Sequence, residues 1–431
     1  MSLRTKRDAY LLLLALLALP QQAAAQGIVW SGVGPINRSM GGAAAAAPLD
    51  AAGAIHWNPA SISGLSSSQV VLGADFVVRS TELASVAPAG PGSSFAGSTR
   101  SDTGVDVLPT VAVVWQPCDS RWACGLGVFT VGRIGENYAA DDPANPSNTV
   151  LQPPPFGLGP VYSKLSVTQI VPSVAFEVSD RLSVGFAPTI SVADVAFDPF
   201  LYTTPGAPNT YPPGTHTRLH WGLGFQAGVY WELDQGWRLG ASYKSPQWFE
   251  GFDFASIDTR GVPQQLSMNL DYPGISSIGV SYVGHPRWVW ALDLRYMDYD
   301  NAEWFGNQAA LDPAGRVTGL GWRSVFSVAK GLQYELIDCL TLRAGYVYTE
   351  NPIPDEATFF NIPTTAIYEH VGSIGATWKI SQQTSLSLAY VHAFENTIRG
   401  SIPATVAGGP GSTVAAQQSA DALTAGLEIR F

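Results

Sequence analysis

Charged residues are scarce in this chain of 431 residues, and basic residues are scarcer than acidic ones. Asp, Glu, Lys and Arg together make up 13% of the sequence, and the formal net charge is −11. A protein that binds nucleic acid needs a basic surface to meet the phosphates. The charge balance therefore argues against nucleic acid as a partner.

Long hydrophobic runs are absent beyond the N-terminus. After residue 25, no apolar run reaches the ~18 residues that a membrane-spanning helix requires, so no such helix is predicted there. The first 25 residues combine Arg4 and Lys6 with an apolar run over 10–19 and small residues at 23–25. This pattern is typical of a cleaved secretory signal peptide, which we predict over residues 1–25.

Cysteine and catalytic motifs are rare as well. None of the six histidines lies near a Gly-x-Ser-x-Gly motif, and His216 and His220 lack the glutamate of a zinc protease motif. We therefore predict no enzyme activity, no metal site and no cofactor. Cys118 and Cys124 flank a short turn, so a disulfide across the base of a hairpin is one prediction, and small apolar side chains are the alternative.

Glycine and aromatic residues are abundant where charges are few. The sequence has 44 Gly, 13 Trp, 16 Tyr and 18 Phe. Apolar residues alternate with polar or small ones along many segments, most clearly along residues 423–431. A strand of an outer-membrane β-barrel has one face suited to lipid and one suited to water. Aromatic girdles flank the apolar band of such a barrel.

Fourteen segments fit this strand pattern. They begin near Ser67, Thr103, Arg121, Tyr162, Arg181, Thr217, Trp237, Gln264, Arg287, Arg316, Leu340, Thr364, Thr384 and Val414. Short turns alternate with long loops over 80–102, 135–161, 198–216, 250–263, 301–315, 350–363 and 400–413. A closed barrel with both termini in the periplasm requires this alternation and leaves no strand edge unpaired in lipid. We therefore predict an all-β fold, a 14-stranded antiparallel transmembrane β-barrel over residues 66–431.

A short segment of small side chains lies between the signal and the barrel. Residues 26–65 contain Gly41, Gly42 and the turn Asn58-Pro59-Ala60. We predict that this segment is an N-terminal hatch that plugs the barrel, with these residues as its gate. Because Pro59 pushes Asn58 out of the helical region, the Asn58 amide is expected to cap a turn and position the hatch.

Several motifs extend across the mature chain. They include Trp57-Asn58-Pro59-Ala60, Gly240-Ala241-Ser242-Tyr243-Lys244-Ser245-Pro246, Gly321-Trp322-Arg323, Ala329-Lys330-Gly331-Leu332-Gln333-Tyr334 and Asn351-Pro352-Ile353-Pro354-Asp355. With them, the chain resembles the FadL family of outer-membrane transporters of hydrophobic compounds, which includes long-chain fatty acid channels and TodX-like aromatic hydrocarbon channels. The resemblance implies ligand capture in a groove among extracellular loops, a site beside the hatch, and sideways exit into the membrane.

The third predicted strand carries several glycines. Gly127, Gly132 and Gly135 weaken the pairing of this strand with its neighbours. Ordinary bulging is one explanation. The resemblance implies a kinked strand that opens a gap in the barrel wall next to Asn58-Pro59-Ala60.

A fatty acid ligand would need a cation for its carboxylate. Alternation places Arg238, Lys244, Arg323 and Arg343 in the lumen, and Arg323 occupies the family's basic position after Trp322. Pairing with acids in the lumen explains each of these cations equally well. A neutral hydrocarbon would need no cation.

Aromatic residues of the loops are candidates for the apolar groove. They are Phe200, Tyr202, Trp248, Phe249 and Phe252. The alternative is that they belong to the outer aromatic girdle.

The expected function is passive uptake of long-chain fatty acids or similar hydrophobic molecules across the outer membrane of a Gram-negative bacterium. A channel for neutral aromatic hydrocarbons is the alternative in the same fold, and a general porin or an outer-membrane acyl hydrolase are further alternatives. The expected partners are the hydrophobic ligand, outer-membrane lipid and lipopolysaccharide, and the protein is expected to be a monomer.

Overall fold

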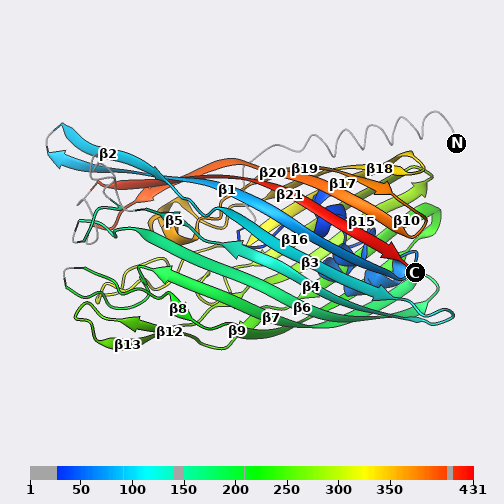
Figure 1. The fold of residues 1–431 in the computed structure, drawn as a ribbon, viewed down its shortest axis with the longest axis horizontal. Helices are drawn as coiled ribbons and strands as arrows, with labels where there is room; N and C mark the ends of the chain where they lie inside the picture. Colours follow the sequence, from blue (N-terminus) through cyan, green and yellow to red (C-terminus); the bar gives the residue numbers. More distant parts are fainter. Residues whose placement is uncertain (1–26, 91, 140–149, 155, 208, 405–410) are drawn as a thin grey trace.

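Fourteen long strands form the wall of a closed antiparallel barrel in the computed structural model (Figure 1). The structure describes residues 27–90, 92–139, 150–154, 156–207, 209–404 and 411–431. The predicted signal peptide lies outside these residues. Each wall strand pairs with the next one along the chain, and the first strand pairs with the last from Gln69↔Arg430 to Val86↔Thr413.

The wall strands differ in length and several carry short extensions. They are β1 (Gln69–Gly90), β3 (Val105–Trp115), β4 (Trp122–Ile134), β6 (Val161–Ser179), β7 (Leu182–Asp198), β9 (His220–Glu232), β10 (Trp237–Lys244), β15 (Gly274–His285), β16 (Trp288–Asp298), β17 (Val325–Ile337), β18 (Leu340–Thr349), β19 (His370–Lys379), β20 (Thr384–Ser401) and β21 (Thr413–Arg430). The extensions are β5 (Asn137–Tyr138), β11 (Gln247–Phe249) and β14 (Asp271–Tyr272).

Side chains alternate between the lumen and the outer surface, as predicted from the sequence. On β21, Ala422 is 5% exposed and Leu423 is 54% exposed, while Glu428 is 3% and Ile429 is 39% exposed. The outer positions carry the large apolar side chains that lipid favours. The alternation therefore both buries a polar or small-residue lumen face and supplies an apolar outer band.

Two predictions about the loops were wrong in part. Residues 80–102 were predicted to be a loop, yet β1 runs on to Gly90 and forms a hairpin with β2 (Ser93–Arg100) that extends beyond the barrel (Figure 1). Residues near Gln264 form β13 (Pro263–Met268), which joins β12 (Phe252–Ile257) and β8 (His216–Thr217) in a separate sheet. Local strand propensity marks a strand, but it does not say which sheet the strand joins.

Two further predicted strand starts were too early. The strand expected near Arg316 begins at Val325, because Arg316 lies in a turn around Asp312 and pairs with its carboxylate at 3.0 Å. The strand expected near Thr364 begins at His370, because Thr364 ends the 3₁₀ helix η4 (Phe359–Thr364), which follows η3 (Asp355–Ala357). The remaining predicted starts lie close to the observed ones.

The predicted disulfide is absent. Cys118, Cys124 and Cys339 are free thiols. In the hairpin of β3 and β4, Cys124 lies opposite Trp115, whereas Cys118 lies in the turn beyond the last pair. Because the two cysteines are not at paired positions, the turn does not bring them together.

The hatch fills the lumen with short helices (Figure 1). It contains α2 (Gly34–Ser39), α3 (Ala51–Trp57) and the 3₁₀ helix η1 (Pro59–Gly64), and every residue of α2 and α3 is buried. Asp50 starts α3, since its Oδ1 accepts a hydrogen bond from Gly53 N at 3.0 Å. Among the described residues, no helix is long and apolar enough to cross a membrane.

Glycines on the lumen face of the wall make room for the hatch. A Cβ atom at Gly240 would lie 1.9 Å from Ala45 O, one at Gly345 would lie 2.0 Å from Gly41 N, and one at Gly185 would lie 2.2 Å from Ala60 N. Hatch backbone therefore packs directly on wall backbone at these points. This fit accounts for part of the high glycine content.

Candidate ligand site

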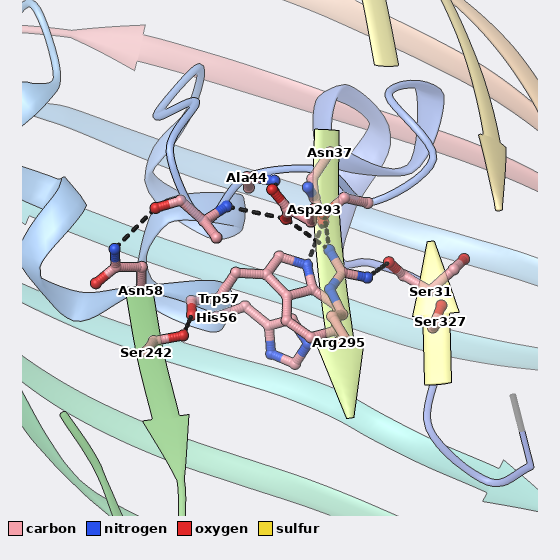
Figure 2. Close-up of polar contacts among 12 residues, drawn as sticks. Ser31, Asn37, Ala44, His56, Trp57, Asn58, Ser242, Asp293, Arg295 and Ser327 are labelled. Carbon is pink, nitrogen blue, oxygen red and sulfur yellow. Dashed lines mark hydrogen bonds and ion pairs between the residues drawn. The ribbon is translucent and has the colours of Figure 1, made fainter. Parts of the chain in front are cut away.

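An ion pair on β16 anchors the first half of the hatch (Figure 2). Asp293 Oδ2 accepts hydrogen bonds from Ala44 N at 2.9 Å and Ala45 N at 3.0 Å. Arg295 Nη2 donates to Asp293 Oδ2 at 3.0 Å and to Gly42 O at 2.5 Å. Both side chains are almost fully buried, so each charge depends on the other and on the hatch backbone.

Trp57 at the end of α3 packs against this ion pair. The Arg295 guanidinium lies 3.4 Å from the centre of the Trp57 ring, and Trp57 Nε1 donates to Asn37 Oδ1 at 3.1 Å. The Trp57 carbonyl accepts a hydrogen bond from Ser242 of β10 at 2.5 Å (Figure 2). Trp57 therefore ties α3 to α2 and to two wall strands through its ring and its carbonyl.

His56 lies beside Trp57 and faces Lys244 of β10. Lys244 Nζ is 3.4 Å from His56 Nδ1, and the His56 ring packs edge-on against Phe129 of β4. Burial, and then the nearby Lys244 and Arg295 cations, lower the pKa of His56 well below its usual value. The lowered pKa favours the neutral imidazole beside the lysine.

Asn58 links the second half of the hatch to β9. Its Oδ1 accepts from Ala60 N at 3.1 Å and so caps η1, while its Nδ2 donates to Ala45 O at 2.8 Å and to Val229 O at 3.0 Å. The resemblance implied that this turn lies next to a gap in the wall. The structure instead packs its backbone on Gly185 of β7 and Asn58 itself on β9, where the ladder is continuous.

The wall is interrupted between β3 and β4. Their ladder runs from Trp115↔Cys124 only as far as Thr110↔Phe129, although β4 stays paired with β6 up to Ile134. Contact resumes at the bridge Ser101↔Tyr138. Between these limits, residues 102–109 face residues 130–136 without ladder pairing, and we call this interval the window.

Two local features explain why pairing stops there. Pro109, which has no N–H to donate, directly precedes the last paired residue of β3. On β4 the register shifts between Thr130 and Gly132, which is a β-bulge that bends the strand. Residues 130–132 and 134–136 are all buried, so this end of β4 turns toward the lumen.

The first residues of the hatch lie along the window. Val29 forms a bridge with Gly132, and Trp30 N donates to Val131 O at 3.2 Å. A Cβ atom at Gly132 would lie 2.9 Å from the Ile28 side chain, so glycine permits this close approach. Of the three glycines predicted for a wall gap, Gly132 lies within the window, Gly135 lies near its upper limit, and Gly127 lies below it, paired with Ala112.

Three charged side chains cross the window. Asp106 of β3 accepts from Arg133 of β4 at 2.9 Å and from Arg79 of β1 at 2.8 Å. Arg79 Nη1 also donates to Arg133 O at 3.3 Å. We call Asp106, Arg79 and Arg133 the clasp, because it joins the two edges where the backbone ladder does not.

A cavity lies between the window, the first hatch residues and β19 to β21. Residues 27–31 line one side, and apolar side chains line the other, including Val77, Val371, Val391 and Ala422. Arg38, Arg79 and Arg133 supply its cations, and Arg38 pairs with Asp75 at 2.8 Å. The cavity volume is about 60 Å³, far below the roughly 300 Å³ at which small-molecule pockets begin. A long ligand therefore needs a neighbouring segment to move.

The four cations chosen from the sequence lie elsewhere. Arg323 is exposed and pairs with Glu356 at 2.7 Å, and Arg238 pairs with Glu232 at 3.1 Å. Arg343 donates to Gln333 and Thr377, and Lys244 faces His56. None of these four lines the cavity.

The sequence contained a signal for one of the cations that do line the cavity. Arg79 alternates in phase with Val77 on β1, which places it in the lumen, but the predicted loop began at residue 80 and left Arg79 at a strand end. Arg38 lies in the hatch, and Arg133 lies beyond the bulge. In neither place does the alternation of apolar and polar residues predict which way the side chain points.

The predicted groove aromatics separate into two groups. Phe200, Tyr202 and Phe252 are buried, and the first two pack with Phe197 at ring distances of 6.4 and 5.3 Å. Trp248 is 52% exposed at the outer surface, and Phe249 is partly buried beside Phe252. The open depression among the loops lies elsewhere, with a volume of about 570 Å³, between Tyr211, Leu311, Phe360 and Pro403.

Metal chemistry finds no support in the part of the chain that the structure describes. Within residues 27–431 outside the undescribed gaps, no group of three or more His, Cys, Asp or Glu side chains could hold a metal ion.

Comparisons with known proteins identify the family. Residues 14–431 match the family described as outer membrane protein transport protein (OMPP1/FadL/TodX). The long-chain fatty acid transport protein of Escherichia coli O6:H1 is 24% identical over 230 residues, which cover 48% of each chain. The 47 kDa outer membrane protein of Pasteurella multocida is 24% identical over 40% of this chain and 43% of its own. These matches span about half the length of the curated relatives or less.

Solved structures share the fold over nearly the whole chain. The Pseudomonas putida toluene transporter TodX has a TM-score of 0.68 at 17% identity, covering 93% of this chain and 99% of its own. A FadL homologue of Pseudomonas aeruginosa has a TM-score of 0.69 at 16% identity, covering 94% and 100%. With the barrel, the hatch and the match over residues 14–431, the chain belongs to the OMPP1/FadL/TodX family of outer-membrane transport proteins.

Proposed function

We propose that the protein is a passive uptake channel that carries long-chain fatty acids or similar hydrophobic molecules across the outer membrane. The observation that carries this proposal is an apolar cavity that lies directly against an interrupted wall, above a hatch that fills the lumen. A curated relative named a long-chain fatty acid transport protein supports the substrate class. The protein acts after removal of its signal peptide, as a monomer surrounded by outer-membrane lipid and lipopolysaccharide.

The proposed route has three stages. Ligand is captured in the depression among the extracellular loops, moves to the cavity beside the hatch, and leaves sideways through the window into the membrane. Each buried methylene contributes about 0.8 kcal/mol, so a hydrophobic chain gains nothing from a water-filled lumen and much from this path. The side exit lets the chain enter lipid without crossing the periplasmic mouth of the barrel.

Movement near the hatch is part of the proposal. The cavity is too small for a long chain, and residues 28–30 both line it and lie along the window edge of β4. The body of the hatch is held by Asp293, Arg295 and Asn58, whereas residues 28–30 have few side-chain ties to the wall. We propose that this first segment shifts while the body stays in place.

The cations at the cavity favour an acidic ligand. Arg79 and Arg133 line the cavity and share one carboxylate, that of Asp106, so the clasp by itself carries one positive charge in excess. A ligand carboxylate would balance this charge.

A neutral aromatic hydrocarbon is the second candidate ligand. The observation that favours it is the small cavity volume of about 60 Å³, which suits a compact molecule better than a long one. The fold likeness to the toluene transporter TodX is consistent with either ligand, because it shows the fold alone.

Uptake by cells tests the proposal. Cells that lack their own fatty acid transporter and produce this protein are expected to take up labelled oleate faster than cells with an empty vector. Uptake of labelled toluene instead of oleate would support the second candidate. A large steady ion conductance in planar bilayers, the behaviour of a general porin, would overturn both.

A further inference from the structure

The clasp connects the two edges of the window through side chains alone. Asp106 reaches from β3, Arg133 from β4, and Arg79 from the neighbouring strand β1, with ion-pair distances of 2.8 to 2.9 Å. Their side chains are only 4% (Arg79), 12% (Asp106) and 15% (Arg133) exposed. Contacts this well shielded from water are strong, so parting the edges of the window requires the clasp to break.

The clasp is also incompletely satisfied. Arg79 Nε and Arg133 Nη1 are buried and have no hydrogen-bond partner. Both arginines line the cavity, whereas Asp106 does not. Buried guanidinium donors without acceptors are costly, so this position favours a further anion that approaches from the cavity.

Other charged groups nearby already have partners of their own. Glu136, on the link between β4 and β5, is held by Thr81 at 3.3 Å and by Gln418 at 3.2 Å. Arg38 pairs with Asp75, and Asp421, which also lines the cavity, pairs with His392 at 2.8 Å. These groups neither complete the clasp nor compete for its unpaired donors.

We propose that Asp106 is an internal stand-in for the ligand's carboxylate and that ligand binding opens the window by exchange. This inference rests on the proposed function. The carboxylate of an acidic ligand enters from the cavity, binds Arg79 and Arg133, and releases Asp106. Arg133 then no longer holds β3, and the two edges of the window separate.

The exchange makes the opening selective for charge. One carboxylate replaces another on the same two arginines, so both arginines keep a carboxylate partner when Asp106 is released. A neutral molecule of the same shape offers no acceptor of equal strength, so it leaves Asp106 in place. The clasp therefore determines specificity through the headgroup, separately from the apolar fit of the chain.

Asp106→Asn tests the exchange, with Asp102→Asn as the matched control. Asp102 lies at the upper limit of the window and is exposed, and its side chain accepts a hydrogen bond from the nearby Gly104 N at 3.3 Å. Uptake of oleate and of the neutral oleyl alcohol is measured for wild type and both variants, after barrel insertion is checked by heat modifiability on gels.

Wild type and Asp102→Asn are expected to take up oleate and exclude oleyl alcohol. Asp106→Asn is expected to raise oleyl alcohol uptake by about tenfold, the factor expected from removing one charge-assisted hydrogen bond across the window. Unchanged discrimination in an inserted Asp106→Asn variant that still carries oleate overturns the exchange and leaves the proposed function standing. Failure of wild type to carry either molecule overturns the proposed function itself.

A distance measurement covers the case in which Asp106→Asn does not insert. In an otherwise wild-type barrel with its three cysteines replaced by serine, spin labels are placed at Val107 on β3 and Asn137 on β5, which are both exposed. Oleate is expected to lengthen the distance between the labels, and oleyl alcohol is not. Equal distances with both molecules overturn the exchange.

Discussion

Two seams of the same barrel are built in different ways. At the closing seam, β1 pairs with β21 from Gln69 to Val86 without a register shift. At the seam between β3 and β4, the ladder ends at Thr110↔Phe129, and the clasp and residues 28–30 of the hatch take its place. Backbone pairing makes a permanent join, whereas side chains and a plug segment make a join that can open.

The largest expected effect comes from loosening the hatch that supports the second seam. Arg295→Met leaves Asp293 buried without its partner and should lower the free energy of unfolding by about 3–5 kcal/mol. Ion conductance should rise because the plug is less firmly held, while the closing seam keeps the barrel intact. Urea unfolding and planar-bilayer recording measure the two effects.

The double variant Asp293→Asn with Arg295→Met is the control for this prediction. It removes both charges, so it should recover part of the lost stability. A double variant less stable than Arg295→Met would show that the ion pair is not the main contact of the hatch.

A substitution at the window should act locally. Gly132→Val places methyl groups where a Cβ is already 2.9 Å from Ile28 and 3.0 Å from Tyr272, at an expected cost of about 1–3 kcal/mol. We expect residues 28–30 to be displaced from β4, which changes uptake of oleate more than insertion. Gly372→Ala is the matched control, because its Cβ would meet nothing closer than 3.4 Å. Equal effects of the two variants would contradict a special role of Gly132.

Hydrogen exchange sharpens the comparison without any substitution. Amides of residues 102–109 and 130–136 should exchange at least about tenfold faster than amides of residues 72–78 and 421–427, because the former lack ladder partners on one side. Mass spectrometry of the protein in detergent micelles measures both sets. Equal protection would mean that the clasp and the hatch hold the window as firmly as a ladder.

The last expected effect is a pH dependence near the window. Burial raises the pKa of Glu136 from its usual value of 4.5 to about 7, so the folded protein binds more protons than the unfolded one between these values. Stability should therefore fall as the pH rises from 4.5 to 7. Glu136→Gln keeps the contacts with Thr81 and Gln418 and should flatten this slope in urea unfolding at several pH values. A slope as steep as in wild type would assign the effect to other buried acids such as Asp50, whose pKa is also raised to about 7.

The barrel itself could be predicted from the sequence because its signals are local. Alternation along residues 423–431 and the short turns give strand positions and faces directly. The errors fell near Gln264, Arg316 and Thr364, where loop segments have their own strands, turns or helices. In those segments the local pattern is the same whether a strand belongs to the wall or to a loop.

The site could be predicted only in part, because it depends on where pairing stops. Gly132 was predicted to lie at a wall gap because its strand contains several glycines. The hatch turn at Asn58 was predicted because a proline follows it. The clasp joins residues 79, 106 and 133 from three strands, and no spacing in the sequence brings them together. Alternation tells which residues face the lumen, but it does not tell their height along the barrel or which strand has lost a neighbour.

The glycine contacts between wall and hatch bear on how the protein is assembled. The hatch backbone packs on Gly185 of β7, Gly240 of β10 and Gly345 of β18, which come from early, middle and late parts of the chain. Once β21 has closed on β1, no passage of that shape remains through which the hatch could be threaded. We therefore expect the hatch to fold inside a barrel that is still open, so that insertion into the membrane and plugging are a single event.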